Sequence, residues 1–158
     1  MSLFGLLSRW FWVLCIAVTF FNAATAWLNA KRRIESRPEL RKGYRTLTRA
    51  LATWGNLPWL VMGFGCTYGR VPSVFSFFRP RDGNPYVLVF FCAVFLVWVV
   101  GTYWLMFRGG AQMLVDHPGF LSIEAKSPRA VMAIWFVCIL GGAVAVVWMF
   151  FGNFPVPT

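Results

Sequence analysis

Three long runs of apolar residues constrain the fold of this chain more than any other feature. They cover residues 10–28, 86–107 and 130–151, and none of them contains Asp, Glu, Lys, Arg or His. An α-helix needs about 20 mostly apolar residues to cross the hydrocarbon core of a bilayer. We therefore expect an all-α, polytopic integral membrane protein, with a single membrane domain over residues 1–158.

The composition agrees with a membrane protein and excludes several other classes. Hydrophobic residues make up 59% of the chain and charged residues 13%, whereas soluble domains carry about 25% charged residues. Such a chain is too apolar for a disordered protein. Its four cysteines lie in four different apolar segments, the three above and a fourth at residues 50–68, and they show no C-x-x-C spacing. We therefore predict neither a disulfide scaffold nor a metal site.

A fourth apolar segment, residues 50–68, is harder to interpret. It is interrupted by Asn56 and Pro58, and a proline inside a helix removes a hydrogen bond and kinks or ends the helix. Either one kinked helix crosses the bilayer, or a short re-entrant piece follows an interfacial helix. We favour the first, a bundle of four transmembrane helices with the second broken near Pro58, because non-helical backbone at membrane depth needs other protein to satisfy it. Asn56 is a candidate cap for a helix that begins at Leu57.

A strongly basic stretch lies between the apolar segments at residues 10–28 and 50–68. The whole chain carries a formal charge of +10, and eight of its fifteen basic residues lie here: Lys31, Arg32, Arg33, Arg37, Arg41, Lys42, Arg45 and Arg49. Ser36 and Glu39 form a capping-box pattern, which predicts a basic amphipathic helix over residues 37–49. Because it adjoins an apolar segment, we interpret this stretch as a surface for anionic lipid headgroups or a membrane-protein partner, and not for nucleic acid.

The positive-inside rule fixes one feature of the topology. With either three or four spans, eleven basic residues share a side with the 31–49 loop and four lie opposite. Cytoplasmic loops carry the excess of Lys and Arg, so we expect the 31–49 loop in the cytoplasm, in a bacterial inner (plasma) membrane. Only Arg9 precedes the first apolar run as a basic residue, so we expect that run to be retained as a span and not cleaved as a signal peptide.

The ionisable residues that catalysis or ion coupling needs all fall outside the predicted spans. The histidine, His117, lies beside Asp116 in an Asp-His-Pro-Gly turn, and the acids are Glu35, Glu39, Asp82, Asp116 and Glu124. Ion-coupled transporters and proton relays place such groups inside the bilayer. Neighbouring residues do not face each other on a helix, so we expect His117 to be an exposed turn residue, and we predict no enzyme, no catalytic residue and no cofactor.

These observations predict a non-catalytic accessory or assembly subunit of a larger membrane complex. The Phe-rich loop around Phe75, Phe77 and Phe78 supports this hypothesis, because it is apolar enough to lie in the interface or against a partner. The alternative is an oligomeric channel or carrier for a neutral or anionic solute, because broken helices expose backbone groups that coordinate solutes. A third hypothesis is a membrane enzyme that uses Asp116 and His117.

Overall fold

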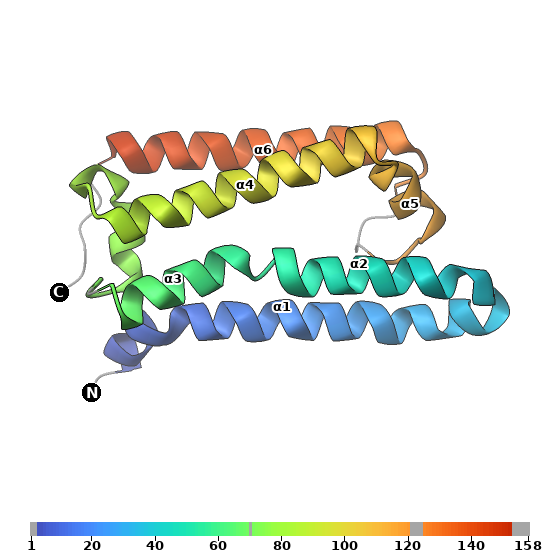
Figure 1. Cartoon of the computed structure of the whole chain (residues 1–158), viewed down its shortest axis with the longest axis horizontal. Coiled ribbons are helices and arrows are strands. Elements are labelled where there is room, and N and C mark those ends of the chain that lie inside the picture. The colour runs from blue at the N-terminus through green and yellow to red at the C-terminus, as the bar shows by residue number, and fades with distance from the viewer. Residues whose placement is uncertain (1–2, 70, 121–124, 153–158) are drawn as a thin grey trace.

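The computed structural model describes residues 3–69, 71–120 and 125–152, and within them the regular structure is helical. The longest helix, α1 (Leu3–Ser36), is followed by a short 3₁₀ turn, η1 (Pro38–Leu40). The chain then returns through α2 (Arg41–Trp54) and α3 (Leu57–Thr67), and crosses one end of the bundle through η2 (Val74–Phe78) and η3 (Pro80–Asp82). It continues through α4 (Pro85–Phe107), the short α5 (Gly110–Asp116) and α6 (Pro128–Phe151) (Figure 1).

Three helices are long and apolar enough to cross a membrane: α1 over Leu7–Ser36, α4 and α6. They contain the three apolar runs that the sequence singles out. The first helix is longer than predicted, because it continues through Lys31, Arg32 and Arg33 to Ser36. Lys and Arg are good helix formers, so the end of the apolar run does not end the helix.

The capping box predicted at Ser36 and Glu39 does not form. Ser36 ends α1, and its hydroxyl donates to the Arg33 carbonyl at 3.0 Å. The next α-helix begins only at Arg41, after the 3₁₀ turn, and no side chain caps it. The prediction was wrong because α1 extends into the segment that was expected to cap the following helix.

The apolar segment over residues 50–68 is broken close to the predicted position. Gly55 and Asn56 separate α2 from α3, and Pro58 lies in the first turn of α3, where its missing N–H costs no helical hydrogen bond. Asn56 does precede α3, but its side chain does not cap it; Asn56 Nδ2 instead donates to the Ala52 carbonyl at 2.8 Å. Together α2 and α3 run back along the length of α1 (Figure 1).

The Phe-rich loop packs in part against its own bundle, which the sequence did not predict. Phe77 is only 2% exposed, and it joins Val71, Val74, Met62 and Val87 in a buried cluster between α3 and α4. This closes one end of the bundle, where α1 begins and α6 ends (Figure 1). Of the three phenylalanines, only Phe78 is classed as exposed.

A short helix, α5, lies between the last two long helices. Gly109 turns the chain into it with a φ of +72°, a conformation that glycine adopts without strain. In the sequence, Ser127 and Pro128 form the pattern of a helix cap followed by a first turn. The last helix does begin there: the Ser127 hydroxyl accepts from the Ala130 N–H at 3.2 Å, and Pro128 occupies the first turn of α6.

Glycines set several of the close contacts between helices. A Cβ at Gly63 of α3 would lie 2.5 Å from the Trp12 ring of α1, and one at Gly142 of α6 would lie 2.6 Å from the Trp98 ring of α4. These glycines therefore let the indole rings lie against the neighbouring backbone, as expected for helix association in lipid. Gly141, by contrast, faces open space.

Candidate functional site

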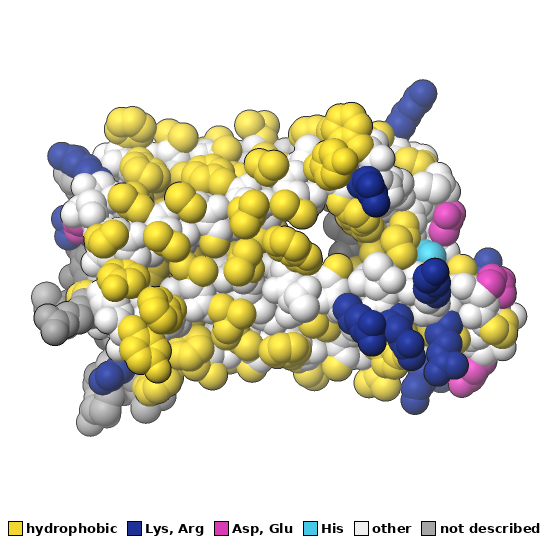
Figure 2. Space-filling view, viewed as in Figure 1, with side chains coloured by type: hydrophobic (Ala, Val, Ile, Leu, Met, Phe, Trp, Pro, Cys, Tyr) yellow, Lys and Arg dark blue, Asp and Glu magenta, His cyan; other side chains and the backbone are white. Residues whose placement is uncertain are grey.

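The basic residues gather at one end of the bundle, which we call the basic end: the connection from α1 to α2 together with α5 and the start of α6. Figure 2 shows Lys and Arg concentrated there and apolar side chains along the middle of the molecule. Of the described basic residues, Arg9, Arg79 and Arg81 lie at the opposite end. Seven of the eight predicted binding residues are exposed: Lys31, Arg32, Arg37, Arg41, Lys42, Arg45 and Arg49.

The apolar face of α2 packs inside the bundle. Tyr44 is 1% exposed and Leu47 is 3% exposed, and α2 lies against α1. The apolar side chains of this helix, Tyr44 and Leu47, are thus used for packing within the bundle. The helix is amphipathic: its apolar stripe contacts protein, and its basic stripe stays outside.

The eighth basic residue, Arg33, belongs to a partly buried contact between distant parts of the chain. Its Nη1 donates to the Pro118 carbonyl at 2.6 Å, and the Tyr44 hydroxyl donates to the same oxygen at 2.8 Å. The His117 ring meets the Tyr44 ring edge to face, with 4.8 Å between centroids. We call Arg33, Tyr44, His117 and Pro118 the His117 cluster; it ties α1 and α2 to the turn after α5.

The structure corrects the prediction that His117 is an exposed turn residue. The side chain is 8% exposed, and its Nδ1 lies 2.7 Å from the Met113 carbonyl. A carbonyl accepts only, so His117 Nδ1 carries a proton and donates this hydrogen bond. Nε2 faces Gly43 so closely that a Cβ there would overlap it. Gly43 thus makes room for the imidazole against the backbone of α2.

Asp116 and His117 do not bond to each other. Asp116 Oδ1 accepts from Gln112 Nε2 at 2.7 Å, one turn earlier on α5, while His117 bonds to Met113. A histidine base needs an accessible nitrogen and a group that orients the ring toward the reactant. Here the imidazole is oriented toward the α2 backbone, and the Asp116 side chain is exposed.

A polar cavity of about 740 Å³ lies beside the His117 cluster, between η1 with the start of α2 and the end of α5. Charged groups of both signs line it, together with the imidazole: Arg37, Glu39, Lys42, Asp116 and His117. This lining offers both hydrogen-bond donors and acceptors to a polar group.

An apolar groove of about 480 Å³ adjoins this cavity and shares Thr46 with it. It lies between α2 on one side and α4, α5 and α6 on the other. Three tryptophans dominate its wall: Trp54 of α2, Trp104 of α4 and Trp135 of α6. None of its lining residues, all from the described part of the chain, carries a charge.

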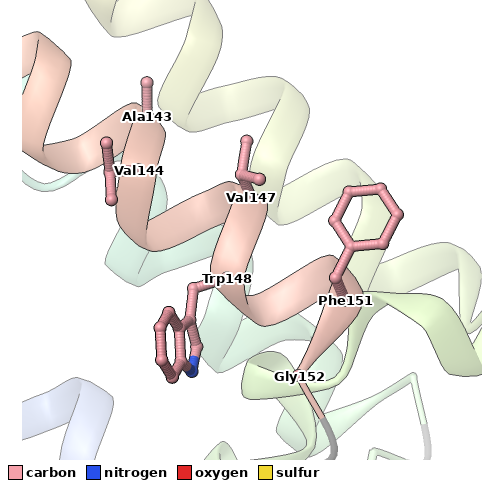
Figure 3. A pocket seen from close by; sticks show the side chains of 6 residues that line it. All are labelled: Ala143, Val144, Val147, Trp148, Phe151 and Gly152. Carbon is pink, nitrogen blue, oxygen red and sulfur yellow. The ribbon is translucent and has the colours of Figure 1, made fainter.

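A second apolar hollow, of about 550 Å³, lies on the outer surface of α6. Figure 3 shows the side chains that line it, all from this one helix and its C-terminal cap: Ala143, Val144, Val147, Trp148, Phe151 and Gly152. Of the 24 residues of α6, only Val131 is buried. This helix therefore presents most of its surface outward.

The described residues offer no metal site. No group of three His, Cys, Asp or Glu among them is placed to hold an ion. The four cysteines, Cys15, Cys66, Cys92 and Cys138, are free thiols on separate helices.

Comparison with known proteins gives no relative. No protein-family model, no curated protein and no solved structure matches this chain. Its function must therefore be argued from its own residues.

Sequence reasoning found the basic surface and the helix break but missed the His117 cluster and the groove. Both depend on contacts between α2 and residues about seventy positions later in the chain. One signal was present: Gly43 interrupts an otherwise good helix-forming stretch, and a glycine in a helix interior often marks a close packing contact.

Proposed function

We propose that the chain spans the membrane four times and is a non-catalytic accessory or assembly subunit of a larger membrane complex. In this proposal α2 and α3 together form the second crossing, and the basic end lies in the cytoplasm. The path of α2 and α3 along the whole of α1 supports the crossing (Figure 1). The gathering of basic residues at one end supports the orientation.

The observation that carries the accessory role is the sparse packing of α6. In lipid, helices associate through close packing, and small residues let backbones approach. Ala143 of α6 and the C-cap residue Gly152 line an outer hollow, whose lining residues all come from this helix and its cap (Figure 3). Such a face fits a transmembrane helix of another subunit.

Affinity purification in mild detergent tests this role. We expect one membrane protein to accompany the tagged chain at constant stoichiometry. The Val144→Trp substitution fills the α6 hollow and should release that partner. Val18→Trp is the matched control, because Val18 is an exposed valine on α1, at 48% exposure. A chain that runs as a clean monomer, or a partner that both variants retain equally, would count against the proposal.

The alternative proposal, a channel or carrier formed by oligomerisation, has one supporting observation. Asn56 is 2% exposed at the helix break, and its Oδ1 has no hydrogen-bond partner. Discontinuous helices in transporters use such groups to coordinate solutes. Solute flux into liposomes tests it; no flux above that of empty vesicles removes it.

A further inference from the structure

The apolar groove between α2 and α4 is a formed cavity and not merely a lipid-facing surface. Its volume of about 480 Å³ falls within the roughly 300–1,000 Å³ typical of small-molecule sites. It is lined from four helices, by Ala50 of α2, Gly101 of α4, Leu114 of α5 and Trp135 of α6 among others. Walls from separate elements can enclose a ligand that one helix face cannot.

The bend at Gly55 and Asn56 creates the groove. Beyond the bend, α3 packs against α4, whereas α2 packs against α1. Figure 1 shows α2 and α4 diverging from the bend toward the basic end. If α2 and α3 formed one straight helix, its side chains would fill this space. Because the helix bends, the space next to α2 stays open.

Fixed tryptophans form the far wall. Trp135 Nε1 donates to Thr102 Oγ1 at 2.9 Å, and the absence of a side chain at Gly101 lets the ring lie against α4. Trp104 is held in the same way against Gly110, where a Cβ would lie 2.5 Å from the ring. Tryptophan side chains whose rotamers are already fixed lose little entropy when a ligand binds.

The length of the groove is close to the thickness of one leaflet. Its lining residues run along α2 from Thr46 to Gly55, the residue that follows the helix, which at 1.5 Å per residue is about 14 Å along the helix axis. Half of a hydrocarbon core of about 30 Å is about 15 Å. One lipid chain of the leaflet at the basic end would fill this length.

Two basic residues of α2 flank Thr46, the lining residue nearest the basic end. Thr46 lines the groove, and Lys42 and Arg49 lie four residues before it and three after it, so all three share one face of α2. Both cations are exposed. Basic residues beside a pocket between transmembrane helices attract anionic lipid headgroups.

We propose that this groove binds one acyl chain of an anionic glycerophospholipid from the surrounding leaflet, with the lipid phosphate at Lys42 and Arg49. The proposal rests on the four-span placement proposed above and is independent of the accessory role. It turns the basic surface from a general attraction for headgroups into one defined lipid site.

Native mass spectrometry of the full chain tests the site after reconstitution in phosphatidylglycerol and, separately, phosphatidylcholine of the same chain length. We expect one phosphatidylglycerol to stay bound per chain. Ala50→Trp, which fills the groove, should abolish retention. Ala145→Trp, the same change at an exposed position on α6, should retain the lipid.

A pair of charge variants tests the headgroup contact. Lys42→Gln with Arg49→Gln should weaken the preference for phosphatidylglycerol by about fivefold per charge removed, since each basic residue near an anionic surface contributes about 1 kcal/mol. Arg9→Gln with Arg81→Gln removes two exposed charges at the opposite end and should leave the preference unchanged.

A chain-length series keeps the test decisive if Ala50→Trp fails to fold. The unmodified protein should retain phosphatidylglycerol with 16- or 18-carbon chains, but not with 6-carbon chains, which cannot fill a groove of about 14 Å. Equal retention of both lengths, or equal retention by the Ala50 and Ala145 variants, overturns the site. The partner experiment above is scored separately, so either proposal can fail alone.

Discussion

Gly43 leaves room on α2 for the His117 ring. Because a Cβ at this position would overlap His117 Nε2, we expect Gly43→Ala to force the imidazole or α2 to move. Overpacking of this kind costs about 1–3 kcal/mol of unfolding free energy. The midpoint of thermal unfolding in detergent, followed by circular dichroism, measures the loss.

Gly141→Ala is the matched control for that prediction. Nothing lies within 4 Å of a Cβ at Gly141, so the helix propensity of alanine should raise stability by up to about 1 kcal/mol. In the double variant Gly43→Ala, His117→Ala, the overlap is gone, and part of the lost stability should return. If Gly43→Ala unfolds at the same midpoint as Gly141→Ala, the close approach of α2 to His117 is refuted.

The Tyr44 hydroxyl gives a second prediction at this scale. It is buried and donates to the Pro118 carbonyl at 2.8 Å, so Tyr44→Phe should cost about 1 kcal/mol, the usual net value of one hydrogen bond. Tyr68→Phe, at a position 75% exposed, should leave the unfolding midpoint unchanged. Equal midpoints for the two variants would show that the Tyr44 bond contributes nothing.

Among the elements, the broken second helix decides the topology. If α2 and α3 cross the bilayer together, the connection after α3 and the connection before α2 lie on opposite sides. Pro72 and Glu39 are exposed residues in these two connections, and neither belongs to an α-helix. In a background with all four native cysteines replaced by alanine, we expect an impermeant thiol reagent added outside to label Pro72→Cys and not Glu39→Cys.

The opposite model gives a different labelling pattern. With a re-entrant piece in place of a crossing, both cysteines lie on the same side and are labelled or protected together. Permeabilised membranes serve as the control, since both positions should then react. Ser73, although next to Pro72, is unsuitable because it is buried and its hydroxyl accepts a hydrogen bond from the Phe75 N–H.

Local patterns predicted the elements that local forces determine. The apolar runs located α1, α4 and α6, and Ser127 with Pro128 located the start of the last helix. The sequence did not reveal α5 or the burial of Phe77 and His117, because these depend on which distant segments meet. Ser36 and Glu39 matched a capping pattern that tertiary packing overrode when α1 continued past the apolar run.

Taken as a whole, the molecule is polarised along its length. Its apolar middle lies between two ends (Figure 2). One end is closed by the buried cluster around Phe77, and the other is the basic end. At the basic end, Arg33 is committed to the Pro118 carbonyl, while seven neighbouring cations stay exposed. The packing contact and the exposed charge at this end thus belong to different basic residues and can be changed separately.

Neutralising the exposed cations tests what orients the molecule. The variant changes seven residues to glutamine: Lys31, Arg32, Arg37, Arg41, Lys42, Arg45 and Arg49. By sequence, this leaves four basic residues at each end. Because Lys and Arg near the spans set orientation, we expect labelling of Pro72→Cys from outside to fall from nearly complete to a mixture. Arg33 is kept, so the His117 cluster should persist and the unfolding midpoint should change little.

A charge-conserving variant separates this effect from loss of the native side chains as such. Lys31→Arg with Lys42→Arg keeps every charge and should keep complete labelling of Pro72→Cys. Complete labelling of the neutralised variant as well would mean that the order of the spans, and not the charge difference between the ends, fixes the orientation. The basic end would then be explained by lipid binding alone, which the charge variants at Lys42 and Arg49 measure directly.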